Sequence, residues 1–418
     1  HHPAFLTLRA HPMKIDFVSD VSCPWCAIGL HALEQALDRV APEIRATLHF
    51  QPFELNPQMP GEGQDVVEHL SQKYGIDEAQ IAANTEAIRQ RGAGVRKLGL
   101  RADMDALPIQ ETTGLPHASC HNGLMHACGH DGHTAMLLAA AEHLAKHSTF
   151  DGTLNLIFQP AEESLGGARK MMEDGLFDRF PCDAIFAMHN MPGFRQGQLL
   201  LREGATMASS ENILVHLDGK GGHGAMPHLS ADPVVAGASI VMALQTIVSR
   251  NVPPLQMAVI TVGAFQSGVA NNVIPQNATL KLSVRALDRG VRELLRRRIV
   301  ELVEAQAQSY GVTARVEFLP GYPVLVNTPT ETALAREVAV ALVGVENVVL
   351  QTEPLTGSED FAYMLEKVPG SYLFIGNGDE ASGGHGACMV HNPNYDFEDR
   401  NIPVGAAFWV QLAERFLA

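Results

Sequence analysis

The 418-residue sequence has little positive charge and few cysteines, and it lacks a long uninterrupted apolar run. Its 30 Lys and Arg against 46 Asp and Glu give a formal net charge of -16, which would repel the phosphate backbone of a nucleic acid. No run reaches the ~18 apolar residues that a membrane span needs, and no secretory leader opens the sequence. We therefore expect a cytoplasmic protein that binds small molecules, with no nucleic acid and no membrane as partner.

The six cysteines are too sparse for a secreted disulfide scaffold. Three of them stand in sequences with chemical potential: Cys23 and Cys26 in CPWC, and Cys128 among histidines. With 46% apolar and 18% charged residues, the composition is that of a globular protein, and the length suffices for two or three domains. Residues 1–12 are interpreted as a tag or an upstream extension and are left out of the fold prediction.

The N-terminal part has a strand, turn and helix pattern. Apolar alternation predicts a strand over residues 13–18, and apolar residues at helical spacing predict a helix over residues 28–40, with CPWC between them. A dithiol at a helix N-terminus gains thiolate character, because the helix dipole favours negative charge there. A second strand is expected over residues 46–55, followed by helical sequence from about residue 66 to 91.

Two stretches carry a family resemblance in this part: residues 16–29 (DFVSDVSCPWCAIG) and 50–57 (FQPFELNP). They resemble the start of a DsbA-like oxidoreductase of the FrnE group. The resemblance covers residues 13–93 and implies a partial thioredoxin-like strand-helix-strand segment, with Cys23 and Cys26 as possible redox residues. The later thioredoxin strands and their proline loop are not found, so a fragment kept for its packing is the alternative.

In the rest of the chain, polar side chains follow predicted buried strands. The strand over residues 95–100 leads to Asp103 and Asp105, the strand over 153–158 leads to the Glu162-Glu163 pair, and the strand over 183–188 leads to His189. Sites in open α/β sheets gather at this carboxyl edge. A helix predicted over residues 131–147 adds Cys128 and His130 just before its first turn.

These residue types point to metal chemistry. Imidazole, thiolate and carboxylate groups suit zinc, manganese, cobalt or nickel. Two such ions, about 3.5 to 4 Å apart, would hold a bridging water and polarise a carbonyl group. Of two adjacent glutamates, one can bind metal while the other takes the proton of the water. A single histidine among the 19 is more often a surface or core residue, so the prediction depends on the combination.

Seven sequence motifs then identify a family. In chain order they are residues 101–111 (RADMDALPIQE), 125–134 (MHACGHDGHT), 158–163 (FQPAEE), 188–190 (MHN), 221–228 (GGHGAMPH), 271–275 (NNVIP) and 391–397 (HNPNYDF). With these motifs the chain resembles the amidohydrolase branch of the aminoacylase and carboxypeptidase metallopeptidases, which holds hippurate hydrolases, N-acetyl-amino-acid deacetylases and indole-acetyl-amino-acid hydrolases. The resemblance covers residues 94–418.

The resemblance implies an α/β fold: a three-layer catalytic domain over residues 94–208 and 321–418, with an inserted α+β lid or dimerisation domain over 209–320. It implies two divalent metal ions and Glu162 as the catalytic base. Asp103 and Asp105 would orient metal ligands from outside the metal shell. The implied ligands are Cys128, His130, Glu163, His189 and His391.

The lid prediction also follows from the local pattern. Between residues 212 and 320 the expected order is strand, helix, strand, strand, helix, strand, which makes a compact α+β unit. In relatives such a domain pairs with its copy, so we expect a homodimer or a higher homo-oligomer. His223 would stabilise the oxyanion of the tetrahedral intermediate in the partner's site. Asn271 and Arg285 would hold the free carboxylate of the substrate. The alternatives are a turn residue for His223 and a surface strand residue for Arg285.

A further segment, residues 356–362, is predicted to open a helix behind a serine cap. Glu359 and Asp360 are interpreted as charges that complement the dipole of this helix. The alternative is that both carboxylates face the site.

The family pattern breaks at residues 92–95. Relatives carry about a quarter of their catalytic domain ahead of the RADMD sequence, whereas here the oxidoreductase-like segment occupies that place. Either this segment replaces the missing edge of the catalytic sheet, or the edge stays bare and can pair with another chain.

The leading hypothesis is a metal-dependent amidohydrolase that cleaves the amide bond of N-acyl-amino acids, hippurate-like or N-acetylated, by attack of a metal-bridging water activated by Glu162. The first alternative is a thiol-disulfide oxidoreductase that works through Cys23 and Cys26. The second is a catalytically idle metal-binding fusion protein.

Overall fold

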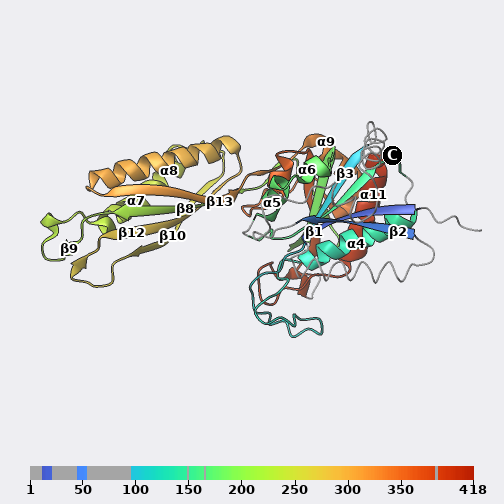
Figure 1. Cartoon of the computed structure of the whole chain (residues 1–418), viewed down its shortest axis with the longest axis horizontal. Coiled ribbons are helices and arrows are strands. Elements are labelled where there is room, and N and C mark those ends of the chain that lie inside the picture. The colour runs from blue at the N-terminus through green and yellow to red at the C-terminus, as the bar shows by residue number, and fades with distance from the viewer. Residues whose placement is uncertain (1–11, 21–44, 54–95, 148–149, 164–165, 382–384) are drawn as a thin grey trace, which may run out of the picture.

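The computed structural model describes residues 12–20, 45–53, 96–147, 150–163, 166–381 and 385–418. These residues form a large sheet covered by helices on both faces and, apart from it, a smaller sheet with two helices on one face (Figure 1). The predicted α/β architecture with a separate α+β unit is confirmed. Cys23, Cys26 and the two helices predicted before residue 93 lie outside the described residues.

The large sheet has eight strands in the order β15-β6-β16-β5-β3-β4-β1-β2. Its centre is parallel, and β6 runs antiparallel to β16. The central strands are buried along nearly their whole length, as in parallel sheets covered on both faces. The strands described here are β3 (Lys97–Asp103), β4 (Thr153–Gln159), β5 (Ala184–Pro192), β6 (Leu199–Leu200), β15 (Val348–Val349) and β16 (Gly370–Gly378).

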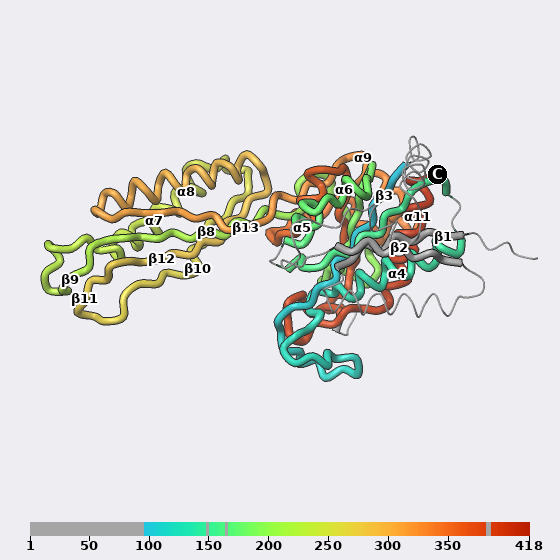
Figure 2. The backbone as a smooth tube through the Cα atoms, in the orientation of Figure 1, coloured from blue at the N-terminus to red at the C-terminus, as the bar shows by residue number. Residues whose placement is uncertain are grey.

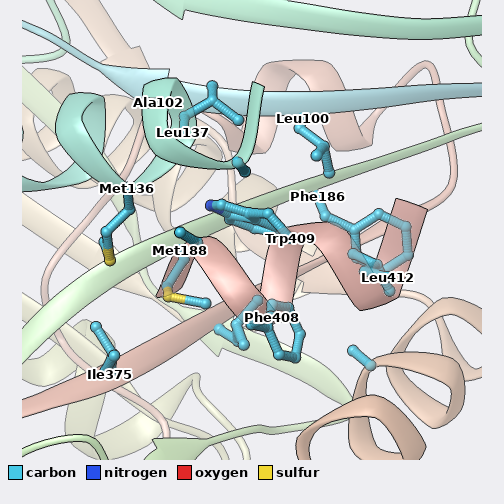
Figure 3. Close-up of a cluster of buried hydrophobic side chains, with 14 of the residues drawn as sticks. Leu100, Ala102, Met136, Leu137, Phe186, Met188, Ile375, Phe408, Trp409 and Leu412 are labelled. Atoms are coloured by element: carbon cyan, nitrogen blue, oxygen red, sulfur yellow. The ribbon is translucent and has the colours of Figure 1, made fainter. Parts of the chain in front are cut away.

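Alternate residues of these strands enter two separate hydrophobic cores. On β5, Phe186 and Met188 join the core beneath one set of helices, while Ile185 and Ala187 join the core beneath the other. Figure 3 shows the first core, where Trp409 and Phe408 pack among side chains of the sheet. The first set of helices is α4 (His130–His147), α9 (Pro329–Val343) and α11 (Asn401–Leu417), and the second is α5 (Gly167–Glu173), α6 (Leu176–Arg179) and α10 (Ala362–Leu365).

The edge of the large sheet is completed by the N-terminal segment. β1 (Pro12–Asp20) runs parallel to β4, with Val18 opposite Ile157, and β2 (Arg45–Phe53) pairs with β1 from Pro12 opposite Arg45 to Asp20 opposite Phe53. Both strands lie close to their predicted positions. Of the two outcomes considered for the fusion, the structure has the first: the segment supplies edge strands that β4 would otherwise lack.

The smaller sheet is antiparallel, in the order β10-β12-β8-β13. Its predicted strand and helix order is confirmed. The side chains of Asp232 and Asp288 accept hydrogen bonds from the backbone N–H groups of Val234 and Val291 and so cap its two helices. The elements are β8 (Ser209–Asp218), α7 (Pro233–Arg250), β10 (Ala258–Ser267), β12 (Asn277–Ala286), α8 (Arg289–Ser309) and β13 (Thr313–Tyr322).

Short elements lie at the two ends of this unit. β7 pairs with β14 where the chain passes between the two parts, and β9 pairs with β11 at the end remote from the large sheet (Figure 1). Their bounds are β7 (Gly204–Met207), β9 (Gly222–His223), β11 (Val273–Ile274), β14 (Leu325–Asn327), and the 3-10 turns η1 (Pro227–Leu229), η2 (Val345–Asn347) and η3 (His385–Ala387).

Helix α7 is more apolar than expected from the sequence. By length and composition alone its 18 residues meet the requirement for a membrane span, although Ser239, Gln245 and Arg250 interrupt the apolar sequence. Its inner side packs in the core of the smaller domain through Ile240, Leu244 and Ile247, all fully buried. A single helix of this kind is weak evidence for a span, because core helices of globular proteins meet the same criteria.

The prediction for residues 356–362 was wrong in its details. α10 begins only at Ala362, and no side chain caps it. Ser358 instead accepts a hydrogen bond from Arg285 at 2.8 Å, so its hydroxyl joins the smaller domain to the larger one. The carboxylate of Glu359 accepts from the backbone N–H of Phe361 at 2.9 Å, but its other contacts point into the protein interior.

Candidate metal centre

The candidate site lies at the carboxyl edge of the large sheet, where three strands end next to one another. Asp103 is the last residue of β3, His189 lies in the final half of β5, and Glu163 follows β4 by four residues. Cys128 precedes α4, and His130 begins it. Figure 2 shows the long segment between β3 and α4 running beside the segment before α11, where the backbone N–H of His391 bonds Ala127 O at 2.7 Å.

The five residues predicted as metal ligands come together here. The donor atoms of Cys128, His130 and Glu163 all lie within 4.8 Å of one another. Cys128 Sγ is 3.3 Å from His189 Nε2, and His391 Nε2 is 2.9 Å from Glu163 Oε1. Cys128 and His391, which are 263 positions apart in the sequence, thus belong to one cluster. This is the geometry that the prediction required. Their role as ligands stays a prediction.

A second group of donors overlaps the first at His130. It consists of Asp103, His130, His133 and His189, again within 4.8 Å. Both ring nitrogens of His130 are buried without a well-formed hydrogen bond, although Asp105 Oδ1 lies 3.3 Å from Nδ1. Buried polar atoms are rarely left in this state. Because the orphaned nitrogens sit among thiol, imidazole and carboxylate donors, the residues present fit divalent metal ions.

The backbone between Cys128 and His130 requires glycine. Gly129 has φ 82°, and a Cβ atom there would lie 2.4 Å from both the Asn190 side chain and the Tyr395 hydroxyl. Two other residues, Ala161 and His391, have φ values of 58° and 65° without being glycine. These conformations are uncommon for such residues; Ala161 directly precedes the Glu162-Glu163 pair, and His391 is itself a candidate donor.

Asp105 fixes the pair of glutamates through their backbone. Its two carboxylate oxygens accept the N–H groups of Glu162 and Glu163 at 3.0 and 2.9 Å. From the other side, the hydroxyl of Tyr322 donates to Glu162 O. The loop after β4 is thereby held at three points, so the two adjacent carboxylates have defined and different directions.

The protein environment of Glu162 favours the protonated form of its carboxyl group, compared with a glutamate side chain in water. Its side chain is buried, and burial raises its pKa well above the ordinary value. The negative charges of Glu359, Asp360 and Glu163 raise this pKa further. A carboxyl group with a raised pKa can accept a proton and pass it on near neutral pH, as a general base and acid must.

The pKa of the Cys128 thiol is shifted in the opposite direction, below its ordinary value. Burial opposes its ionisation, yet the contacts with His189, His130 and His391 lower its pKa to about 5. In turn, burial lowers the pKa of His189 while the Cys128 charge raises it, to about 8 overall. Hydrogen bonds to Cys128 and Glu163 raise the pKa of His391 to about 10. The cluster therefore favours a thiolate at position 128, which is the form that binds metal.

His133 supports this centre, although its role was not predicted from the sequence. His133 Nδ1 lies 2.6 Å from Asp103 Oδ1, and its Nε2 accepts the backbone N–H of Asn190 at 2.9 Å. Asp103 was expected to orient a ligand; its closest histidine partner is His133, with His130 Nε2 at 3.9 Å. The HDGH spacing places His133 in the first turn of α4 and was the available signal.

Glu359 and Asp360 do not act as charges at a helix start, which corrects our interpretation. They are 2% and 0% exposed and contact the buried guanidinium of Arg101 at 2.9 and 3.2 Å. Asp360 N also lies 3.4 Å from Glu162 Oε1. The alternative, in which both face the site, holds. The sequence signal for these contacts was Arg101, a charged residue within the otherwise apolar strand β3.

The three predicted substrate contacts are separated in the chain. His223 on β9 and Asn271 before β11 share the remote tip of the smaller domain, where Val273 lies opposite His223. Arg285 lies near the other end of β12, bonded to Ser358. The eight residue steps from Asn277 to Arg285 span roughly 27 Å at ~3.4 Å per strand residue. Asn271 and Arg285 of one chain are therefore too far apart to bind the same substrate carboxylate.

Comparison with protein families gives two matches. Residues 99–415 match the model of peptidase family M20/M25/M40, and residues 14–100 match that of the DSBA-like thioredoxin domain. The first match includes every residue discussed for the candidate metal centre. The second ends within β3, so the two matches meet at residues 99–100, a few residues after the junction expected at 92–95.

Individual proteins are similar over most of the chain. A hippurate hydrolase from Campylobacter jejuni is 43% identical over 344 residues, covering 82% of this chain and 88% of that protein. An N-acetyl-L-cysteine deacetylase from Bacillus subtilis is 41% identical, covering 77% of this chain and 74% of that protein. The solved structure of a dinuclear metal-binding peptidase of the M20 family from Bacillus subtilis superposes with a TM-score of 0.66 at 30% identity, covering 81% of this chain and 93% of that chain.

Proposed function

The chain belongs to peptidase family M20/M25/M40, and from this membership and the clustered donors we propose that it hydrolyses the amide bond of N-acyl-amino acids. It is a metal-dependent amidohydrolase. One relative is named for hippurate and another for N-acetyl-L-cysteine, which are both N-acylated amino acids. The observation that carries the proposal is the convergence of the five predicted ligands beside Glu162.

We propose that Cys128, His130, Glu163, His189 and His391 hold two divalent ions, from among zinc, manganese, cobalt and nickel. When bound, the ions would supply Lewis acidity to water and to the amide carbonyl. Asp105 would orient His130, whose Nδ1 is 3.3 Å away, and Asp103 would orient His133 and, more distantly, His130. Outer partners of this kind fix the direction of the ligands.

Glu162 would transfer a proton during the hydrolysis. Its buried carboxylate takes the proton from the attacking water and gives it to the departing amine nitrogen. The raised pKa of Glu162 suits both steps, because the group must hold the proton between them. The contacts of Asp105 and Tyr322 with the backbone of this loop keep the carboxylate in place during the transfer.

The substrate contacts would come from two chains. Arg285 is joined to Ser358, the residue before Glu359, whose carboxylate lies near that of Glu162, so Arg285 would grip the substrate carboxylate within its own chain. His223 and Asn271, at the remote tip, would enter the site of the partner subunit, with His223 stabilising the oxyanion. A homodimer or higher oligomer is thus part of the proposal. Exposed apolar side chains on α7, Val235 and Met242, support association through this domain.

The proposal extends to the domains and the compartment. Residues 94–208 and 321–418 form the catalytic domain, 209–320 form the lid and dimerisation domain, and 13–93 form the thioredoxin-like fragment, preceded by a tag or extension. The protein works in the cytoplasm.

The test is a panel of N-acyl-amino acids, including hippurate and N-acetyl-amino acids, with enzyme reconstituted with each of the four metals. Glu162→Gln should lower kcat by roughly 10²- to 10⁴-fold, the usual contribution of a positioned base, while the metal content by elemental analysis stays unchanged. Glu142→Gln, on the exposed side of α4, is the matched control and should behave like the wild type. Full turnover by Glu162→Gln would contradict the proposal.

The match of residues 14–100 to a DSBA-like domain supports a second candidate function, thiol-disulfide exchange through Cys23 and Cys26. Insulin reduction that is lost in Cys26→Ser would support it. Metal binding without turnover of any substrate in the panel would instead support a catalytically idle fusion protein.

A further inference from the structure

Arg101 is a buried cation within the large sheet. Its side chain is 1% exposed, and its guanidinium group contacts three carboxylates and one amide oxygen. Nη1 bonds Asp103 at 2.6 Å, Nη2 bonds Glu359 at 2.9 Å and Asp360 at 3.2 Å, and Nε bonds Gln159 Oε1 at 2.9 Å. An arginine buried this completely is retained only where its charge and donors are matched.

The partners of Arg101 lead to two different parts of the candidate centre. On one side, Asp103 accepts from His133 at 2.6 Å and lies 3.9 Å from His130. On the other side, Asp360 is next to Glu162, with 3.4 Å between its backbone nitrogen and Glu162 Oε1. One side chain therefore joins Asp103, beside His133 and the candidate ligand His130, to the surroundings of the base.

The Glu359 and Asp360 carboxylates are fixed on their far sides as well. Tyr372 donates to Glu359 Oε2 at 2.8 Å, and Gln159 Nε2 donates to Asp360 at 2.7 and 2.9 Å. With Glu162, these two residues form a buried group of carboxylates within 4.8 Å. Without a cation among them, their mutual repulsion would push the group apart and displace Glu162.

We propose that Arg101 is a positioning residue that holds Asp103 and the Glu359-Asp360 pair in one fixed arrangement, so that the metal ligands and the base keep their relative positions. The planar guanidinium offers donors in several fixed directions, whereas a lysine is a single point charge that cannot reach all the carboxylates. The inference rests on the proposed function for the role of Glu162, and on the geometry alone for the contact with Asp103.

The experiment uses the whole chain with the substitution Arg101→Lys, which keeps the positive charge and removes the planar guanidinium group with its several donors. We expect the Kd for Zn²⁺, measured by competition with a chromophoric chelator, to rise about 10- to 100-fold, the usual effect of losing an outer partner of a metal ligand. At saturating metal, kcat should fall by a similar factor while KM changes little. A lower kcat with an unchanged KM indicates that the base is misplaced, whereas a raised KM would indicate loss of substrate binding.

The matched control is Arg292→Lys. Arg292 also pairs with a buried carboxylate, that of Glu211, but it lies on α8 in the smaller domain. This variant should leave the Kd for Zn²⁺ and kcat at wild-type values. Equal losses in both variants would indicate a general effect of breaking a buried ion pair and would overturn the proposal.

A second variant keeps the proposal testable if Arg101→Lys does not fold. Glu359→Gln preserves the shape of the side chain and removes one charge on the base side, so kcat should fall while the Kd for Zn²⁺ stays unchanged. Wild-type kcat in Glu359→Gln, or wild-type Kd and kcat in folded Arg101→Lys, overturns the proposal. If the wild-type protein cleaves no substrate, the proposed function fails, and the Zn²⁺ affinity of Arg101→Lys still decides whether Arg101 positions Asp103.

Discussion

The hydroxyl of Tyr322 donates a hydrogen bond to the main-chain oxygen of Glu162, although the two residues are 160 positions apart. Tyr322 is the last residue of β13, where the smaller domain returns to the catalytic domain. The proposed base is therefore tied to the strand that connects the two domains, and a shift of that strand would reach the base directly.

Tyr322→Phe removes this hydrogen bond and keeps the ring. Since one hydrogen bond contributes about 0.5 to 1.5 kcal/mol, we expect kcat to fall roughly two- to tenfold on the best substrate of the panel. Tyr310→Phe, at the exposed end of α8, is the control and should have no effect. A Tyr322→Phe enzyme with wild-type kcat would show that the loop does not need this contact.

The proposed contribution of His223 to the partner's site can be tested by mixing subunits. His223→Ala and Glu162→Gln should each be nearly inactive as homodimers. Co-refolded together, they should regain turnover, because a mixed dimer contains one site with an intact base and an intact histidine from the other chain. His216→Ala, on β8 of the same domain, should keep full activity. Failure of the mixture to regain any turnover would exclude a site built from two chains.

Removal of the metals should have reversible effects on activity and stability. Dialysis against a chelator should abolish turnover, and addition of zinc, manganese, cobalt or nickel should restore it. Metal that binds only the folded protein stabilises it by about 4 kcal/mol at 1,000 times its Kd, so the melting temperature should rise with metal concentration. Cys128→Ser should show a much weaker rise, since it lacks the thiolate favoured at this position. An equal rise in both proteins would remove Cys128 from the ligand set.

The metal-free protein should lose stability in acid through His133. Burial lowers the pKa of His133 to about 4, and its Nε2 must stay unprotonated to accept the N–H of Asn190. Between pH 4 and the ordinary pKa of about 6.5, the unfolded chain binds a proton that the folded protein does not, so stability falls as the pH decreases through this window. The full loss is about 3 kcal/mol.

Urea unfolding of metal-free protein across this pH range measures the effect. His133→Gln retains a donor toward Asp103 and an acceptor toward Asn190 but does not titrate, so its stability should change less with pH. The difference between the two proteins isolates His133 from the other groups that titrate in the same range. Parallel pH profiles would contradict the prediction.

The edge strand β1 should be needed for stability. Val18→Pro removes a backbone N–H from a strand that lies between β4 and β2, and it should lower the free energy of unfolding by on the order of 1 to 3 kcal/mol. An exposed edge of β4 would also promote association, which light scattering detects. Val18→Thr keeps the backbone donor and is the control. If the proline variant is as stable and as soluble as the threonine variant, the N-terminal strands do not support the sheet.

Local patterns in the sequence were sufficient to predict β3, α4, β4 and β5 and the long elements of the smaller domain, whereas the central strand β16 and helix α11 were not predicted. Strict alternation along β12 and the capped apolar repeat of α8 depend only on neighbouring residues, so the type and order of these elements could be predicted. The candidate ligands were predictable for a related reason: Cys128 and His130 form a motif of adjacent residues, and strand ends in a parallel sheet meet at one edge whatever the detailed packing.

Tertiary structure decided what depends on residues far apart in the chain. The pairing of Arg101 with Glu359, 258 positions away, cannot be read from either segment, because a buried charge is matched only when the sheet and the loop before α10 come together. The same holds for the separation of Asn271 from Arg285, which the length of β12 imposes, and for the place of β1 beside β4. Patterns along the sequence fix local conformation and the types of donor available, whereas distances and the neutralisation of buried charges arise only when the chain packs.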